Sequence, residues 1–257
     1  MISVIIPVYN AEHSIYELTK KILETLAEHQ PEIILVNDNS PDRSHEECIK
    51  ACKEFENQIS YIKLMKNVGE HNAVMAGLKH AEGDWTLIMD DDFQNPPEEA
   101  LKLVNFAKEN EFDVVYGDYE KKKHSFLRNL GSKINDLTAN YILKKPKGLY
   151  LSSFKCFKKS ILNEITKYKG PFPYIDGLIL SITSNIGSLK LSHSLRRIGK
   201  SNYTFLKLIK LYSHMSTNFS TVPIHFFSSV GIIIAFFSTI YGVYIFLEKF
   251  FNPELPL

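Results

Sequence analysis

Residues 87–99 read Leu87-Ile88-Met89-Asp90-Asp91-Asp92-Phe93-Gln94-Asn95-Pro96-Pro97-Glu98-Glu99, so that an apolar run stops abruptly at three adjacent carboxylates. Because carboxylates repel one another, three of them at the end of a buried strand need a compensating cation or ligand charge. Hard oxygen ligands suit Mg²⁺ or Mn²⁺, and Mg²⁺ also takes phosphate oxygens. The segment therefore predicts a metal site that receives a phosphate-bearing substrate.

The alternative interpretation of this segment is an acidic turn that only caps the next helix. The prolines and glutamates of residues 96–99 do suit a first helical turn. Capping needs only one carboxylate, however, and three stand before the Pro-Pro step. The metal interpretation is therefore favoured over the cap.

The segments around this motif alternate between strand and helix patterns. Strands are predicted at residues 3–8, 32–36, 59–64, 85–89 and 114–116, and helices at 15–27, 44–55, 70–80 and 97–109. This alternation predicts an α/β fold, a mostly parallel open sheet with helices on both faces. A further strand is predicted at about residues 150–157.

In such sheets the ligand lies outside the carboxyl ends of the strands. The polar clusters Tyr9-Asn10, Asp38-Asn39 and Asp90-Asp91-Asp92 all follow predicted strands, so we expect them to converge on one crevice. For Asp38, an Asx-turn before Pro41 is the structural alternative. No GxGxxG turn or GxxxxGK[ST] loop follows any of these strands, which disfavours the rival nucleotide-binding folds.

The net charge of +1 hides a strong segregation of charge along the chain. Residues 1–120 hold 10 Lys/Arg against 24 Asp/Glu, residues 121–170 hold 13 against 2, and residues 171–257 hold 7 against 3. A basic middle beside an apolar tail favours an anionic membrane surface over nucleic acid as a partner. The three cysteines lack zinc-site spacing and are interpreted as reduced packing thiols.

The C-terminal part of the chain predicts a membrane helix. Residues 211–247 contain no Asp, Glu, Lys or Arg, and residues 226–247 are dominated by Phe, Ile, Val and Tyr. These 22 residues can cross a ~30 Å hydrocarbon core, whereas a buried helix of that length normally has a polar stripe. Residues 205–212 alternate apolar side chains with lysines, which predicts a helix in the membrane interface.

The charges that flank the apolar stretch predict its orientation. Arginines and lysines at five positions between 196 and 210 precede it, whereas Glu248, Lys249 and Glu254 follow it. The positive-inside rule then places the large domain in the cytoplasm, at the inner membrane. We expect a catalytic domain at residues 1–200, an interfacial segment at 201–222, a transmembrane helix at 223–248 and a short tail at 249–257.

Five motifs stand out along the chain: Pro7-Val8-Tyr9-Asn10, Val36-Asn37-Asp38-Asn39-Ser40, Asn67-Val68-Gly69, residues 89–98 and Arg196-Arg197-Ile198-Gly199-Lys200-Ser201-Asn202-Tyr203. Together they resemble the motifs of family 2 glycosyltransferases of GT-A fold, in the branch that acts on polyprenyl phosphates such as undecaprenyl phosphate, and the resemblance covers essentially the whole chain. Each motif alone is moderate evidence. The acidic motif, Arg-x-x-Gly-x-Ser and a following apolar helix form a specific combination.

The resemblance implies a role for individual residues. The divalent metal, Mg²⁺ or Mn²⁺, would be held by Asp90, Asp92 and Gln94. The nucleotide sugar would be bound by Pro7, Val8, Tyr9, Asn10, Asp38, Asn67 and Asp90. The lipid phosphate would be bound by Arg128, Ser132, Arg196 and Ser201, and the catalytic set would be Asp91, Asp92, Arg128 and Arg196.

Two features depart from the family pattern. Many relatives have a glutamate directly after Tyr-Asn, where this chain has Ala11 and then Glu12. Bacterial relatives usually carry two membrane helices, whereas this sequence reaches Leu257 just after one.

The resemblance also implies an inverting single displacement, in which the metal neutralises charge on the departing pyrophosphate. A lipid phosphate is already anionic near neutral pH, so its attack needs no strong general base, unlike attack by a sugar hydroxyl. Asp176, in Tyr174-Ile175-Asp176-Gly177, is expected either to face the acceptor or to order a loop.

The leading hypothesis is a membrane-anchored hexosyltransferase that moves a sugar from a nucleotide sugar, UDP-linked rather than GDP-linked, to polyprenyl phosphate. Its product would be a lipid-linked sugar for envelope polysaccharide or protein glycosylation. One alternative is a transferase that extends a saccharide acceptor, and another is a membrane-tethered protein that binds nucleotide sugar or lipid without turnover. A homo-oligomer is possible, because membrane helices often associate.

Overall fold

The computed structural model describes residues 1–119, 145–146, 148–191 and 222–252, and every structural statement below concerns these residues. It divides into two compact units, Met1–Tyr203 and Thr204–Leu257. The first unit contains the sheet and its helices, and the described part of the second is one long helix. The domain boundaries expected from the sequence stay predictions.

The first unit is built on one seven-stranded sheet of order β3-β2-β1-β4-β6-β5-β7. All neighbouring strands are parallel except β6, which runs antiparallel to both β4 and β5. The mostly parallel α/β fold predicted from the sequence is confirmed. The strands are β1 (Ile2–Val8), β2 (Pro31–Asn37), β3 (Ile59–Lys63), β4 (Trp85–Ile88), β5 (Val114–Tyr119), β6 (Lys155–Lys158) and β7 (Ile186–Leu191).

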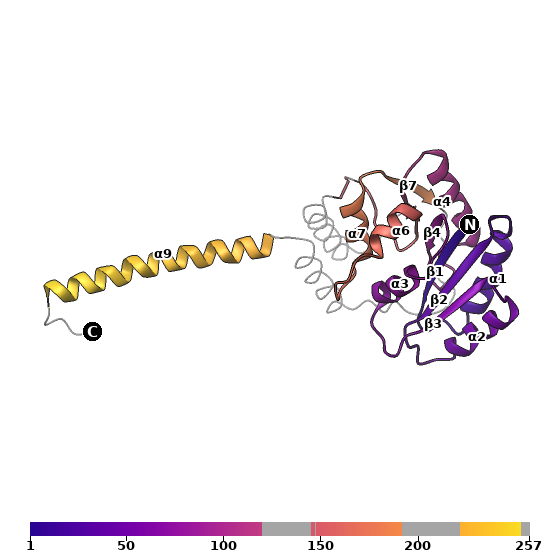
Figure 1. Ribbon diagram of the computed structural model, residues 1–257, viewed down its shortest axis with the longest axis horizontal. Coiled ribbons are helices and arrows are strands. Elements are labelled where there is room, and N and C mark those ends of the chain that lie inside the picture. The colour runs from indigo at the N-terminus through magenta and orange to yellow at the C-terminus, as the bar shows by residue number, and fades with distance from the viewer. Residues whose placement is uncertain (120–144, 147, 192–221, 253–257) are drawn as a thin grey trace. The chain divides into compact units, whose positions relative to one another are not determined.

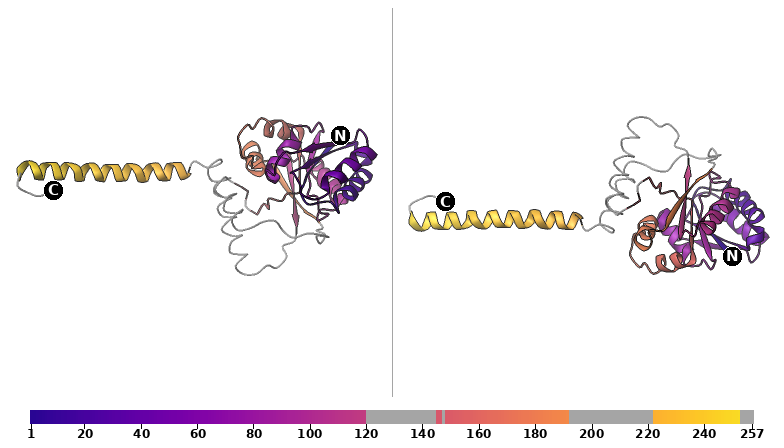
Figure 2. Two further views of the ribbon diagram at one scale, coloured as in Figure 1. Left: turned by 90° about the horizontal axis from the view of Figure 1, so that it is seen from below. Right: turned by 90° about the horizontal axis from the view of Figure 1, so that it is seen from above.

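Helices cover both faces of this sheet (Figures 1 and 2). Helix α1 contacts both α2 and α4, whereas α3 packs on β1 and β2, and α6 packs on β4 and β6. The four helices expected from the sequence in this unit are confirmed at nearly the expected bounds. The helices of this unit are α1 (Ile15–Thr25), the 3₁₀ helix η1 (Ala27–His29), α2 (Ser44–Glu54), α3 (Glu70–Leu78), α4 (Pro97–Glu109), α6 (Lys159–Ile165) and α7 (Ile175–Ile182).

The side chains of β1 point alternately to the two faces of the sheet, and both faces are buried. Val4, Ile6 and Val8 join the core formed with α1 and α4, while Ile5 points to the opposite face, toward α3. All are fully buried, and such continuous apolar runs are typical of central strands in parallel sheets. The rigid central strands thereby hold the loops that follow them in place.

Helix α3 approaches the sheet closely at Gly77. A Cβ atom at this position would lie 2.7 Å from Ile5 Cγ2 and 3.0 Å from Val36 Cγ2. We expect Gly77→Val to lower the free energy of unfolding by about 3 kcal/mol, because overpacking forces the helix off the sheet. Urea denaturation measures this loss, and Ala76→Val, on a less buried position of α3, should cost far less; equal losses would contradict the packing.

The second unit contains α9 (Val222–Phe251). The most apolar 18-residue window of its segment Phe227–Phe251 has a mean hydropathy of 2.2, and none of that window is buried. By length and composition this helix can cross a membrane. The predicted long apolar helix is therefore confirmed, while the predicted interfacial segment at 201–222 lies almost entirely outside the described residues.

Candidate functional site

The loops that follow β1, β2 and β4 meet at one edge of the sheet. Each contains a non-glycine residue with positive φ, namely Asn10 (59°), Asn39 (53°) and Phe93 (62°). Such backbone is uncommon outside glycine and here turns the chain sharply as each strand ends. The Asn10 N–H donates to Ser40 Oγ at 3.1 Å, and the Asp38 N–H donates to the Val8 carbonyl at 3.0 Å.

Asp91 joins the loop after β4 to the loop after β1. Its Oδ2 accepts the Tyr9 N–H at 2.9 Å, and its backbone carbonyl accepts Ser14 Oγ at 2.6 Å. The three polar clusters expected to converge are thus linked by direct hydrogen bonds. Within this arrangement the Asp91 carboxylate holds the backbone of the first loop.

Asp90 lies deeper in the site, where it is partly buried. Its Oδ2 accepts Ser153 Oγ at 2.6 Å and Asn95 Nδ2 at 3.3 Å. Burial, followed by the nearby Glu70 carboxylate, raises the pKa of Asp90 to about 6. The protein alone therefore compensates the negative charge of Asp90 poorly. A cation bound at this edge would supply the missing positive charge.

Asp92 and Gln94 form a tight turn beside Asp90. The Gln94 N–H donates to Asp92 Oδ1 at 3.1 Å, and this hydrogen bond closes the turn. Among the described residues, no three His, Cys, Asp or Glu side chains are already gathered as a metal site. Mg²⁺ and Mn²⁺ sites often use only one or two carboxylates and complete their shell with water and substrate phosphates, so this donor set fits.

Asp38 organises the loop between β3 and α3. Its Oδ1 accepts the Val68 N–H at 2.7 Å and its Oδ2 accepts the Gly69 N–H at 2.9 Å. Burial raises the pKa of Asp38, although the two N–H donors counteract this effect. Asp38 does not make the Asx-turn that was the structural alternative for it. That turn is made by Asn37, whose Oδ1 accepts the Ser40 N–H at 2.8 Å.

We expect Asp38→Asn to loosen this loop, because asparagine has an NH₂ group in place of one carboxylate oxygen. The NH₂ group cannot accept the second backbone N–H. Leaving a backbone donor unsatisfied costs about 1–3 kcal/mol. Amide hydrogen exchange at Val68 and Gly69 should then accelerate by about 10- to 100-fold. Exchange within β1 is the internal control, and unchanged exchange at both amides would contradict the role assigned to Asp38.

The geometry of this edge agrees with what comparisons with known proteins show. The family model described as glycosyl transferase family 2 matches residues 3–166. The chain belongs to this family. Undecaprenyl-phosphate 4-deoxy-4-formamido-L-arabinose transferases from Salmonella choleraesuis and Salmonella paratyphi B are each 34% identical to it over 237 residues, which are 91% of this chain and 72% of the relative.

Solved structures share the fold at low sequence identity. Glucosyl-3-phosphoglycerate synthase from Mycobacterium tuberculosis, in complex with Mn²⁺, UDP-glucose and phosphoglyceric acid, aligns with a TM-score of 0.59 at 16% identity, over 84% of this chain and 76% of that one. TarS 1–349 from S. aureus, in complex with UDP-GlcNAc, aligns with a TM-score of 0.52 at 23% identity, over 84% and 66%. The expected GT-A fold is thereby confirmed.

A second polar cluster lies beside the acidic loop of this family 2 glycosyltransferase. Lys155 Nζ forms a salt bridge with Asp176 Oδ1, and Tyr116 OH donates to the same oxygen at 2.9 Å. Lys155 and Asp176 are only 3% and 6% exposed. Ser153, which donates to Asp90, stands two residues before Lys155, the first residue of β6, so this cluster adjoins Asp90.

His71 packs against the loop that leads into α7. Its ring lies 5.2 Å from the ring of Tyr174 in an edge-to-face arrangement. Burial lowers the pKa of His71 to about 4, so the ring is neutral near physiological pH. This contact makes His71 a packing residue between α3 and the loop before α7.

The remaining predicted residues fall into two groups. Pro7 and Val8 end β1, and Tyr9 and Asn67 are exposed at the same edge. Glu12 is engaged with α2, since its Oε2 accepts the Arg43 N–H at 3.0 Å. The predicted lipid-phosphate ligands lie outside the described residues: Arg128, Ser132, Arg196 and Ser201.

Three residues of the site were missed by sequence reasoning. Ser153 and Lys155 reach the site only because β6 enters the sheet antiparallel beside β4, 63 residues after Asp90 along the chain in the case of Ser153. Glu70 was assigned only to the start of a helix, although its carboxylate raises the pKa of Asp90. The signal available for Ser153 and Lys155 was the predicted strand at 150–157, whose pairing partner was unknown.

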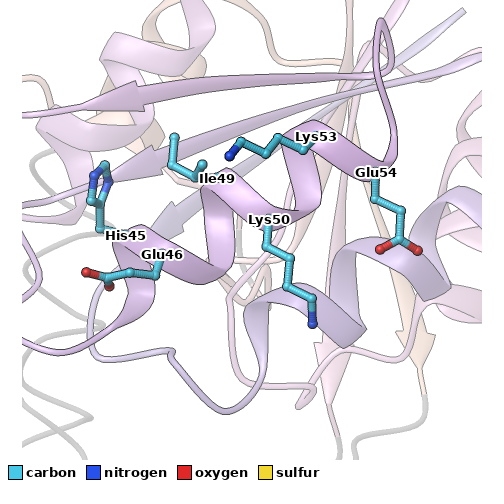
Figure 3. A pocket seen from close by; sticks show the side chains of 6 residues that line it. All are labelled: His45, Glu46, Ile49, Lys50, Lys53 and Glu54. Carbon is cyan, nitrogen blue, oxygen red and sulfur yellow. The ribbon is translucent and has the colours of Figure 1, made fainter.

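A surface groove also lies on the outer face of α2, as Figure 3 shows. It contains none of the residues predicted for the site. His45, at one end of this groove, is linked through its Nδ1 to Tyr61 OH at 2.7 Å, and Tyr61 OH accepts Asn37 Nδ2 at 3.1 Å. The groove is lined by His45, Glu46, Ile49, Lys50, Lys53 and Glu54.

Proposed function

We propose that this glycosyltransferase moves a sugar from a UDP-sugar to a polyprenyl phosphate of the undecaprenyl type, with inversion at the anomeric carbon. The observation that carries the choice of acceptor is the state of Asp176. Its carboxylate is buried, and Oδ1 already accepts both the Lys155 ammonium and the Tyr116 hydroxyl, so this oxygen is occupied by the protein's own donors. An acceptor whose oxygen is already anionic fits such a site better than a sugar hydroxyl does.

The donor side of the proposal rests on the loops after β1, β2 and β4. Asp90, Asp92 and Gln94 would hold Mg²⁺ or Mn²⁺, which when bound would neutralise charge on the departing diphosphate. The Asp38-anchored loop and Tyr9 would border the nucleotide. Solved structures of the same fold with Mn²⁺ and UDP-glucose support a uridine nucleotide.

The acceptor side rests on the relatives and on α9. The names of the Salmonella relatives support undecaprenyl phosphate as the acceptor. We propose that α9 spans the inner membrane with the first unit in the cytoplasm, as the basic residues before it favour. Arg128, Ser132, Arg196 and Ser201 would bind the lipid phosphate, with arginine forks suited to phosphate oxygens.

The identity of the transferred sugar has to be determined by experiment. The sequence led to the expectation of a hexose, whereas the Salmonella relatives are named for a formamido-arabinose, which is a modified pentose. A donor panel should therefore contain UDP-glucose, UDP-N-acetylglucosamine, GDP-mannose and UDP-4-deoxy-4-formamido-L-arabinose. The product would serve as a lipid-linked sugar for the cell envelope.

The test is transfer of label from each donor to undecaprenyl phosphate by membranes that contain the full chain. We expect one UDP-sugar to give lipid-extractable product, and excess EDTA to abolish it until Mn²⁺ or Mg²⁺ is restored. Transfer to a soluble saccharide but not to the lipid would overturn the acceptor. Tight donor binding without turnover on either acceptor would instead indicate a binding protein.

A further inference from the structure

Exposed apolar side chains gather at the same edge of the sheet as the site. In the described part of the first unit, six large apolar side chains are more than a third exposed, and five of them lie in loops at the carboxyl ends of the parallel strands. The exception is Met1. The five are Tyr9, Met65, Val68, Tyr150 and Phe172. Single exposed apolar residues are ordinary, but their concentration at one edge calls for a cause.

The loop between β3 and α3 presents Met65 to solvent. Met65 is 95% exposed and is followed by the exposed Lys66. The loop is nevertheless anchored, because the Leu64 N–H donates to the Asn37 carbonyl at 2.9 Å and Asp38 holds two further N–H groups at its other end. Met65 is thus displayed by a loop that is fixed at both ends.

The loop between α6 and α7 presents Phe172 in a similar way. Prolines on both sides restrict its backbone, and Tyr168 OH donates to the Phe172 carbonyl at 3.2 Å. Gly170 makes this contact possible, since a Cβ atom there would lie 2.2 Å from Tyr168 OH. Phe172 is 43% exposed, and the exposed Lys169 precedes it.

The two loops are neighbours. The rings of His71 and Tyr174, which lie two residues beyond Gly69 and Phe172, are 5.2 Å apart. Within the described residues, neither Lys66 nor Lys169 takes part in a salt bridge. We call the set Met65, Lys66, Lys169 and Phe172 the rim.

We propose that the rim contacts the headgroup region of an anionic bilayer, with Met65 and Phe172 inserted and Lys66 and Lys169 against lipid phosphates. Apolar or aromatic side chains beside lysines are the residue types that favour this interface. The rim consists of separate loop tips, whereas a stable protein–protein contact requires a continuous surface above about 1,000 Å². The proposal rests in part on the proposed function, in which the acceptor is a membrane lipid.

The apolar helix of the same chain makes such a weak contact effective. With α9 in the bilayer, the first unit stays at a high local concentration near the membrane, so that two loop tips suffice. Asp38 binds the backbone of the loop that carries Met65. Contact at the rim would therefore fix the donor site next to the surface in which the acceptor phosphate lies.

The test uses the full chain in lipid nanodiscs, with a cysteine-reactive NBD fluorophore placed at Met65→Cys or Phe172→Cys. The background is Cys52→Ser, because Cys48 and Cys156 are buried. In anionic nanodiscs both labels should show blue-shifted emission and quenching by spin-labelled lipid, and both effects should weaken in zwitterionic nanodiscs. The control label is Glu82→Cys, exposed at the opposite edge of the sheet, which should report water.

Labels at Met65 and Phe172 that match the Glu82 control would overturn the proposal. A blue shift that follows protein concentration in lipid-free detergent would also overturn it, because the partner would then be a second copy. These measurements need no donor and no turnover. The membrane contact of the rim is therefore tested independently of the proposed function, and either can be wrong while the other is right.

Activity supplies a second readout. Lys66→Glu should raise the apparent KM for undecaprenyl phosphate in anionic vesicles by about fivefold, and Met65→Asp and Phe172→Asp should raise it at least as much. In Phe172→Asp, whose loop does not border the nucleotide, the KM for the donor and the rate with a short water-soluble prenyl phosphate should not change. Equal losses on the soluble and the bilayer acceptor would contradict a membrane contact.

Discussion

Asparagine in place of Asp92 is expected to abolish sugar transfer, with kcat/KM falling by about 10³-fold or more. The substitution keeps the size of the side chain and the oxygen that accepts the Gln94 N–H at 3.1 Å, so the turn should survive. It removes one charge from the proposed metal site. Transfer of labelled sugar to undecaprenyl phosphate, measured over a range of Mn²⁺ concentrations, gives the loss.

Asp91→Asn is the matched control, because it is the same substitution one residue earlier. Asparagine can still accept the Tyr9 N–H that Asp91 holds at 2.9 Å, so we expect activity to stay within about tenfold of the wild type. Circular dichroism should show both variants folded. Equal loss in the two would support the catalytic role that the family resemblance implies for Asp91, whereas full activity of Asp92→Asn would remove the proposed metal role.

The location of this edge could be predicted from the sequence, because the signals that define it are local. Each apolar strand ends at a polar turn, and parallel strands bring their carboxyl ends to the same edge. Asp38 and Asp90 were placed in this way, and direct hydrogen bonds between the loops after β1, β2 and β4 confirm the convergence. Pattern and topology suffice when the residues that meet belong to strands of known direction.

The division of labour within Asp90-Asp91-Asp92 could not be predicted. Three identical residues in a row differ only in where their side chains point, and that depends on the turn at Phe93 with its φ of 62°. In the structure Asp91 accepts a backbone N–H of a neighbouring loop, while Asp90 accepts a hydrogen bond from Ser153, which is distant in sequence and lies just before β6. These contacts are tertiary, and no local pattern encodes them.

The polar cluster of Tyr116, Lys155 and Asp176 could not be predicted from the sequence for a related reason. The segment that leads into β6 follows a long basic stretch, and its direction in the sheet is opposite to that of its neighbours. β7 was not predicted, because its sequence Ile-Gly-Ser-Leu-Lys-Leu, at the edge of the sheet, mixes polar and apolar residues. Asp176 was identified, but whether it faces the acceptor or orders a loop depends on Lys155, its partner in space.

Removing one member of the buried Lys155–Asp176 pair is expected to have the largest effect on stability. Lys155→Met leaves the Asp176 carboxylate buried without its cation, which should cost about 3–5 kcal/mol in the free energy of unfolding. The triple variant Lys155→Met/Asp176→Leu/Tyr116→Phe removes both charges and the hydroxyl that would lose its partner. Urea denaturation should show that it recovers most of this loss, with Tyr116→Phe alone as the control.

The same triple variant decides what Asp176 does in the reaction. If the carboxylate only orders the start of α7, transfer to polyprenyl phosphate should stay within about tenfold of the wild type, since no proton has to be removed from an anionic acceptor. Loss of about 10²-fold or more in a variant that has regained its stability would instead assign Asp176 a proton-transfer role. A base is what a sugar hydroxyl acceptor requires, so that outcome would favour saccharide extension over transfer to a lipid phosphate.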